Sequence, residues 1–344
     1  MRLALKLFCS IAFLYVALRQ VELGQVARLL ANSRAASGGA LLSPLSLWTL
    51  LAVGVSLSAS LVNSTKWWLL LRGAGLDVAW RRAAYHYLVG YFLNNIITGL
   101  GEVKRVVDVG RETGAVSAVA STVFVERWTG VTGHLFVSLI AVSVAASRYE
   151  SLRPVWVFNA CACVGLLLVF VVLAGASARG GDGLDSGSVS QEERPLVALW
   201  RSALDAFARM RGARGVMGAA CGLSLVVPLM NVVIHGCLGA AIGAGWGFVW
   251  VVPIAGVFGQ LPVSFNGVGV QEVAYVSLFA CTGVGGAQAV AISVLAHGVK
   301  VAVGAVGWVL SLFGRASSPD LEPVQGDGEP APDEPRQEGV SLRS

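Results

Sequence analysis

The chain has 344 residues, of which 55% are hydrophobic and only 13% are charged, with a formal net charge of +5 at pH 7. Soluble domains carry about 25% charged residues. This composition therefore excludes an ordinary soluble domain and indicates an integral, all-α membrane protein.

Long uncharged runs predict helices that cross the membrane, since about 20 apolar residues are needed to cross about 30 Å of hydrocarbon. The run at 4–19 has no clear small-x-small cleavage site, so we expect a retained first helix rather than a secretory signal. An interfacial helix is expected within 20–38. Further spanning helices are predicted at 43–65, 116–146, 154–177, 215–242 and 287–313.

Basic loops predict the topology, because Lys and Arg gather in short cytoplasmic loops. The loops 66–82, 104–115 and 179–214 are rich in these residues, whereas the turn at 147–153 holds only Arg148 and Arg153. We therefore expect a multi-pass protein of the cell (inner, cytoplasmic) membrane with both termini in the cytoplasm.

A re-entrant segment is predicted between the first two basic loops. Since both loops are expected on the same side, the apolar stretch between them must enter the membrane and return. Asn94, Asn95, Gly99 and Gly101 interrupt this stretch and suit the turn of a hairpin. Such backbone is tolerated at membrane depth only where protein or a wet cavity surrounds it.

The second half of the chain repeats this pattern from the opposite face. The stretch 246–282 is interrupted by Pro253 and by LPVSFNGVGVQE, so it is interpreted as a second re-entrant hairpin. Two opposed broken segments are typical of inverted-repeat transporters and point to their substrate sites.

Four regions result from this interpretation. They are a first transmembrane half, 1–178, with the re-entrant segment 83–105; a cytoplasmic linker and amphipathic helix, 179–214; a second transmembrane half, 215–314, with the re-entrant segment 246–282; and an acidic, proline-rich tail, 315–344, expected to be disordered.

Charged residues near the first hairpin are candidates for function, because ionisable groups at membrane depth are costly. Glu102 and Arg105 follow the hairpin glycines, and Glu126 and Arg127 lie in the next helix. A pair of Arg105 with Glu126, or of Arg127 with Glu102, would supply the counter-charge that such residues need. The alternatives are a positively charged cytoplasmic loop and a cytoplasmic extension of helix 116–146.

A third candidate, Glu272, is the only charged residue between His235 and His297. It is either a protonated core residue or a ligand for a cation or hydrogen-bond donor. Lys300, one helical turn after His297, could reach the same place. Tryptophans including Trp67 are typical of interfacial aromatic belts.

No metal site, cofactor site or soluble catalytic domain is expected. The six cysteines lie in apolar runs without a CxxC pair, and no phosphate loop, HExxH motif or nucleophile elbow is present in the sequence. We expect no enzyme activity and no nucleic-acid partner.

Two stretches resemble a known family. KWWLLLRGAGLDVAWRRAAYHYLVGYFLNNIITGLGEVKRVVDVGRETG with VFVERWTG, and LPVSFNGVGVQEVAYVSLFACTGVGGAQAVAISVL, are similar to the two halves of the flippase-like membrane family that includes the transmembrane region of lysylphosphatidylglycerol synthases. The resemblance covers about residues 3–314. It implies that the family's polar positions fall on Asn95, Gly101, Glu102, Arg105, Glu126, Arg127, Pro262, Gly267, Gly269 and Glu272.

The resemblance implies movement of a phospholipid, an aminoacyl-phospholipid or a lipid-linked sugar between leaflets. The expected partner is a membrane lipid with an anionic or zwitterionic headgroup, alongside a lipid synthase or glycosyltransferase. Arg105 and Arg127 would bind phosphate, since guanidinium gives bidentate contacts. The alternatives are a membrane-embedded transferase acting on a polyprenyl-phosphate lipid, and a non-catalytic partner of a separate lipid synthase.

Overall fold

The computed structural model describes residue 15 and residues 23–35, 43–147, 149–179, 213–259 and 269–314. Several predictions therefore lie outside the described residues. These are the first helix at 4–19 apart from Tyr15, the linker and amphipathic helix at 179–214 except its ends, the tail at 315–344, and the motif residues Pro262 and Gly267.

Helices form nearly all of the described chain. They are α2 (Leu23–Ala35), α3 (Pro44–Gly73), α4 (Trp80–Ile96), α5 (Leu100–Thr113), α6 (Val116–Ala146), α7 (Arg153–Arg179), α9 (Arg214–Ala241), α10 (Val252–Gly259), α11 (Val270–Ala280) and α12 (Gly286–Gly314), with 3-10 turns at Glu150–Leu152 and Val249–Val251. Among the described residues, α3, α6, α9 and α12 are long and apolar enough to cross a membrane. The prediction of a multi-pass, all-helical membrane protein is thereby confirmed.

Two basic loops predicted from the sequence are helical instead. Helix α3 begins at Pro44 behind the cap residue Ser43 and continues to Gly73, so Lys66 lies inside the helix and not in a loop at 66–82. The loop predicted at 104–115 is mostly the helix α5. Charge alone was misleading at these positions, since no helix-breaking residue separates Lys66 from the apolar run before it.

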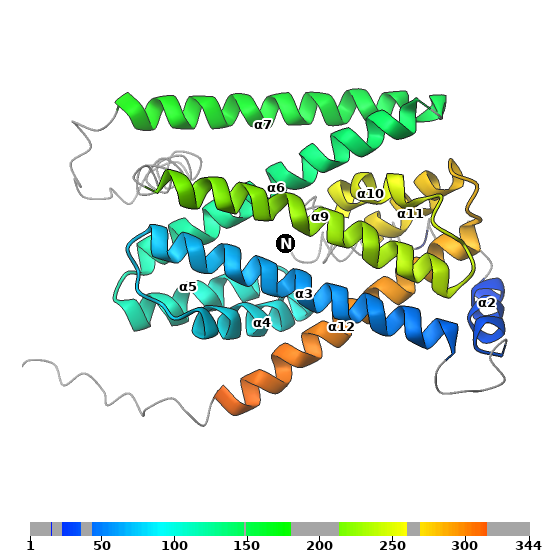
Figure 1. Ribbon diagram of the computed structural model, residues 1–344, viewed down its shortest axis with the longest axis horizontal. Helices are drawn as coiled ribbons and strands as arrows, with labels where there is room; N and C mark the ends of the chain where they lie inside the picture. The colour runs from blue at the N-terminus through cyan, green and yellow to red at the C-terminus, as the bar shows by residue number, and fades with distance from the viewer. Residues whose placement is uncertain are drawn as a thin grey trace, which may run out of the picture.

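The helices α3 and α9 lie side by side through the middle of the molecule, and α6 crosses near them (Figure 1). Glycine allows the close approach of α6 to α9: a Cβ atom on Gly133 would lie 2.4 Å from the carbonyl oxygen of Ser224. Small residues at such crossings are typical of membrane helix packing. Helix α7 lies at one edge of the molecule and packs on α6 (Figure 1).

The helices α4 and α5 form an antiparallel hairpin. Their outer ends are joined by an ion pair, 2.7 Å long, between Arg82 and Glu112. The turn between them uses Gly99 at a φ of 91°, a left-handed conformation that favours glycine. Gly101 packs directly on Gly90, since a Cβ on Gly101 would lie 2.0 Å from the Gly90 carbonyl oxygen.

The second pair of short helices, α10 and α11, lies at the other end of the molecule from α4 and α5 (Figure 1). The two helices contact each other, and α11 packs against α12. The largest apolar core of the described residues is in this region, around Tyr275, Phe248 and Phe279. Each half of the chain therefore contributes one pair of short helices to the same bundle.

Candidate functional site

The turn of the α4–α5 hairpin is held by the side chain of Asn94. Its Oδ1 atom accepts a hydrogen bond of 2.8 Å from the backbone N–H of Gly101, and its Nδ2 atom donates one of 3.1 Å to Oε1 of Glu102. This arrangement satisfies a backbone donor at the start of α5, where helices lack internal partners. It also fixes the carboxylate of Glu102 beside the turn.

Arg105 is buried one turn further along α5, where it pairs with Glu126 of α6. The Nη1 atom of Arg105 donates a hydrogen bond of 2.8 Å to Oε2 of Glu126. The guanidinium lies 4.7 Å from the ring centre of Trp67 and 4.7 Å from that of Tyr87, in cation–π geometry. Trp67 is fully buried and donates to Thr122, so its predicted place in an interfacial belt is wrong.

Arg127 forms a second ion pair, with Glu102. Both pairs suggested by the sequence are thereby confirmed, and they join α5 to α6. The two pairs differ in burial: the Arg127 side chain is 59% exposed, whereas that of Arg105 is 3% exposed. The Arg105 pair is therefore the less hydrated of the two, and its loss would leave a charge in the protein interior.

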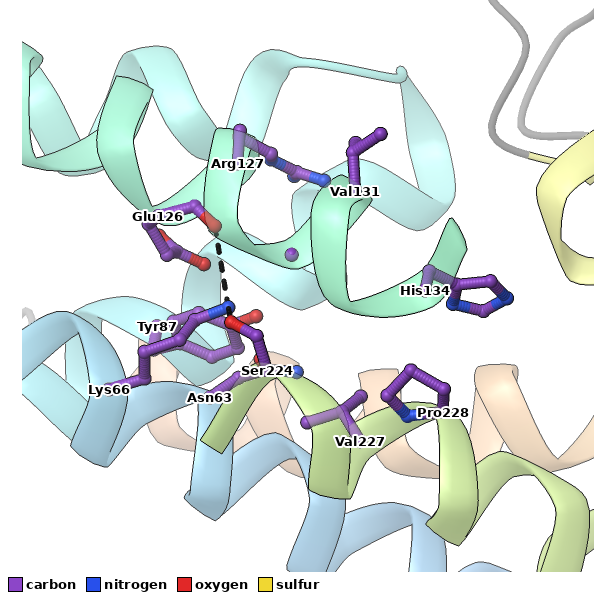
Figure 2. A pocket seen from close by; sticks show the side chains of 11 residues that line it. Asn63, Lys66, Tyr87, Glu126, Arg127, Val131, His134, Ser224, Val227 and Pro228 are labelled. Atoms are coloured by element: carbon purple, nitrogen blue, oxygen red, sulfur yellow. Dashed lines mark hydrogen bonds between the residues drawn. The ribbon is translucent and has the colours of Figure 1, made fainter. Parts of the chain in front are cut away.

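A cavity of about 190 Å³ lies beside these pairs. Its lining residues come from α3, α4, α6 and α9 and are Asn63, Lys66, Tyr87, Glu126, Arg127, Gly130, Val131, His134, Ser224, Val227 and Pro228 (Figure 2). Polar and charged groups thus face a space between helices that are themselves mostly apolar. The cavity joins the two halves of the chain, because α9 belongs to the second half.

Lys66 lies at the α3 wall of this cavity and was not among the predicted site residues. Its ammonium donates hydrogen bonds of 3.3 Å to the carbonyl oxygen of Glu126 and of 3.3 Å to the Ser224 hydroxyl. Ser224 and Asn63 were missed as well. The available signal was the uninterrupted helical stretch 43–73, which would have placed Lys66 inside a membrane helix.

Glu272 lies in a separate polar cluster at the start of α11. Its Oε2 atom accepts from the backbone N–H of Gly269 at 2.5 Å, and its Oε1 atom accepts from Ser293 Oγ at 3.0 Å. Nδ1 of His297 is 3.6 Å from Oε1. Glu272 is not among the residues that line the cavity. Gly269, with a φ of 88°, is the residue directly before α11 and sets the direction in which the chain enters that helix.

Lys300 of α12 contacts both pairs of short helices, through Asn95 of α4 and Gln271 of α11. The Lys300 ammonium donates a hydrogen bond of 3.1 Å to Oε1 of Gln271 on α11. The Lys300 carbonyl oxygen accepts one of 3.0 Å from Asn95 of α4. Gln271 then donates to the Tyr275 hydroxyl at 2.5 Å, and Tyr275 contacts His235 of α9 at 2.6 Å. A continuous polar chain therefore links four helices.

A third group of charges lies at the open end of the α4–α5 hairpin, outside the spanning helices. The Nε2 atom of His86 is 3.3 Å from Glu112, and its Nδ1 atom is 3.7 Å from Asp108. Burial lowers the pKa of His86, and this effect outweighs the two carboxylates, which raise it. The folded protein therefore disfavours the protonated imidazole.

The predicted site residues fall into these clusters as follows. Gly99, Gly101, Glu102 and Arg105 belong to the hairpin turn and its ion pairs, Glu126 and Arg127 line the cavity, Asn95 and Glu272 bind at α12, and Gly269 precedes α11. Within the described part of the chain, no three His, Cys, Asp or Glu side chains are placed to hold a metal ion.

Most of the sequence matches a known protein family. The family model described as the lysylphosphatidylglycerol synthase transmembrane region matches residues 3–307. No curated protein matches the sequence. The matched range includes both pairs of short helices, the cavity and the Glu272 cluster.

Proposed function

Because the chain belongs to the family of the lysylphosphatidylglycerol synthase transmembrane region, we propose that it moves a lipid headgroup between the two leaflets of a membrane. The substrate is a phospholipid, an aminoacyl-phospholipid or a lipid-linked sugar. The protein acts as a transporter. The acyl chains of the lipid stay in the bilayer while its headgroup crosses through the protein.

The observation that carries this proposal is the polar cavity between apolar helices. Three of its four walls, α3, α6 and α9, are candidate membrane spans. Charged side chains within such segments are costly, and they are found where substrates or ions pass. A cavity there that contains Lys66, Glu126 and Arg127 suits a charged headgroup and not an acyl chain.

The arrangement of the hairpins supports the same proposal. We interpret α4–α5 and α10–α11 as re-entrant hairpins of two inverted halves, entering from opposite faces of the cell membrane with both termini cytoplasmic. Their positions at opposite ends of the bundle support this interpretation (Figure 1). So does their shared contact at Lys300, which Asn95 and Gln271 approach from the two hairpins. Broken segments that meet in this way mark the substrate site in transporters.

The direct test is lipid movement in proteoliposomes. Purified protein is reconstituted with fluorescent phosphatidylglycerol, its lysyl ester or a polyprenyl-phosphate sugar, and an impermeant quencher measures the labelled lipid that reaches the outer leaflet. We expect one headgroup to lose its protection in the presence of wild-type protein. Arg105→Ala and Glu272→Gln should abolish this movement.

Matched controls come from an exposed ion pair elsewhere in the chain. Arg153 and Glu150 pair at 2.7 Å, with side chains 71% and 79% exposed, so Arg153→Ala and Glu150→Gln should leave movement unchanged. All variants are first checked for a single folded species by size-exclusion chromatography. If no lipid moves with or without an ion gradient, the transport proposal is wrong, and transferase or escort roles become the hypotheses to test.

A further inference from the structure

We infer that the ammonium of Lys66 is the binding group for a phosphate anion that enters the cavity between α3, α6 and α9. The assignment of this phosphate to a lipid headgroup rests on the proposed function. It gives the anion-binding role to Lys66 in place of Arg105 and Arg127. Binding can also be measured without any transport.

Lys66 is a buried cation without a carboxylate partner among the described residues. The residue is 3% exposed, and its two hydrogen-bond acceptors are a backbone carbonyl and a hydroxyl, both at 3.3 Å. The nearby carboxylates are engaged elsewhere, since Glu126 pairs with Arg105 and Glu102 with Arg127. A buried charge with only neutral partners is costly, and an anion would offset that cost.

The charges around the cavity leave a positive excess. Three cations, Lys66, Arg105 and Arg127, face two carboxylates, Glu102 and Glu126, so one positive charge remains within this group. That charge matches a phosphodiester, which carries one negative charge at neutral pH. Because the two arginines are already neutralised by carboxylates, Lys66 supplies the charge that an incoming phosphate would meet.

The geometry leaves the ammonium accessible from the cavity. An ammonium has three N–H donors, and the described contacts use two of them. Gly130 leaves this side open, since a Cβ there would lie 3.5 Å from the Lys66 Nζ atom. The cavity volume of about 190 Å³ is more than ten times the roughly 10–15 Å³ needed for one water. Figure 2 shows the Lys66 side chain reaching toward Glu126 with Ser224 beside it.

Phosphate binding would also change how the two halves are joined. Lys66 of α3 and Ser224 of α9 are bridged by one hydrogen bond, and the hydroxyl competes with phosphate oxygens for the same ammonium. The opposite charges of an ammonium and a phosphate add an attraction that a neutral hydroxyl lacks. A bound phosphate would therefore draw Lys66 away from Ser224 and weaken this link between the halves.

The test is equilibrium binding to the full chain in a neutral detergent that contains no phosphate. Calorimetry would compare three probes: dihexanoyl phosphatidylglycerol, dihexanoyl glycerol without phosphate, and inorganic phosphate. The first separates from the second only if the phosphoglycerol headgroup is recognised. The third distinguishes a lipid headgroup from a free anion as the source of that phosphate.

Four variants locate the binding group. Lys66→Gln removes the charge, and Lys66→Arg keeps it. Asn63→Asp places a carboxylate three residues away on the same face of α3, where it would neutralise Lys66 without removing it. Lys104→Gln is the matched control, because Lys104 is a partly exposed residue that pairs with Asp108 at 2.6 Å and does not line the cavity.

We expect phosphatidylglycerol to bind wild type, Lys66→Arg and Lys104→Gln with similar affinity, and dihexanoyl glycerol not to bind. Lys66→Gln should weaken binding about tenfold or more, because hydrogen bonds to charged groups are stronger than neutral ones. Asn63→Asp should weaken binding to a similar extent, because its carboxylate would neutralise the Lys66 ammonium. If Lys66→Gln does not fold, Asn63→Asp decides the question. If Lys66→Gln or Asn63→Asp folds and binds phosphatidylglycerol with wild-type affinity, the inference is overturned. It is also overturned if the wild-type protein does not bind phosphatidylglycerol.

The binding and transport results remain separable. Binding that depends on Lys66, without lipid movement in proteoliposomes, would support the anion site and contradict the transport proposal. Lipid movement that is unchanged by Lys66→Gln would support transport and contradict this inference. Binding of inorganic phosphate as tight as that of the lipid would support the anion site and assign it to a soluble anion.

Discussion

Arg105 of α5 and Glu126 of α6 form an ion pair of 2.8 Å in which the side chains are only 3% and 5% exposed. The aromatic rings of Trp67 and Tyr87 lie 4.7 Å from the guanidinium carbon. The pair joins the α4–α5 hairpin to a membrane span, so the position of the hairpin depends on it.

Removal of one partner of the buried pair should destabilise the protein. Arg105→Ala or Glu126→Gln leaves the other side chain without its counter-charge, and breaking a buried pair in this way costs about 3–5 kcal/mol. Denaturant unfolding in detergent, monitored by tryptophan fluorescence, would measure the loss. The double variant should cost less than the sum of the single variants. Additive losses would show that the two side chains are not coupled.

The glycine contact within the hairpin should not tolerate a methyl group. A Cβ on Gly101 would lie 2.0 Å from the carbonyl oxygen of Gly90, so Gly101→Ala should separate α4 from α5 and lower the melting temperature. Gly54→Ala is the control, since nothing lies within 4 Å of its Cβ position and alanine favours a helix by about 1 kcal/mol over glycine. Equal melting temperatures for the two variants would contradict this packing.

The two ends of the α4–α5 hairpin should be accessible from the same side of the membrane. Arg82 binds Glu112 at 2.7 Å, next to Arg111 in the chain. Single cysteines at positions 82 and 111, in a cysteine-free background, should both react with an impermeant maleimide from the cytoplasmic side. A cysteine in place of Ser147, at the far end of α6, should react from the opposite side. Labelling of positions 82 and 111 from opposite sides would exclude a re-entrant hairpin.

The buried imidazole of His86 should make stability depend on pH. Its pKa is lowered from the ordinary 6.5, chiefly by burial, although Glu112 and Asp108 raise it and Arg82 lowers it further. The ring also packs edge-on against Tyr85. Since the unfolded chain binds a proton at higher pH than the folded chain does, stability should fall as pH falls through about 6.5. It should level off once the folded-state pKa is passed.

Denaturant unfolding between about pH 8 and pH 5 would measure this dependence around the normal titration range of histidine. Because the chain contains other histidines, the informative quantity is the difference between wild type and His86→Gln. That difference should change with pH in the expected direction. A constant difference would mean that His86 protonation is not linked to folding.

Much of the architecture could be predicted from local sequence. Hydropathy identified α3, α6, α9 and α12, because a membrane helix must be apolar over its own length. The break near Gly99 was also predicted, since a left-handed turn favours glycine. The suggested partners of Arg105 and Arg127 were confirmed, because charges among apolar helices need counter-charges and few carboxylates were available.

Charge counting was less reliable for segment boundaries. It assigned Lys66 to a loop and most of α5 to another loop, although both stretches are helical. The positive-inside rule describes average loop composition and does not separate a cytoplasmic lysine from one buried between helices. Trp67 was also misassigned to the aromatic belt. Residue type alone does not show whether a tryptophan lies at the protein surface or is buried between helices.

The sequence by itself determined that this is a helical membrane protein of a lipid-related family, where its apolar helices lie, and where the first hairpin turns, because each of these depends on residues close together in the chain. Only the tertiary structure placed Lys66 in a cavity beside Ser224, 158 positions away. The physical reason is that a buried charge and its surroundings come from different helices. Their meeting depends on how the helices pack, which local hydropathy and charge do not specify.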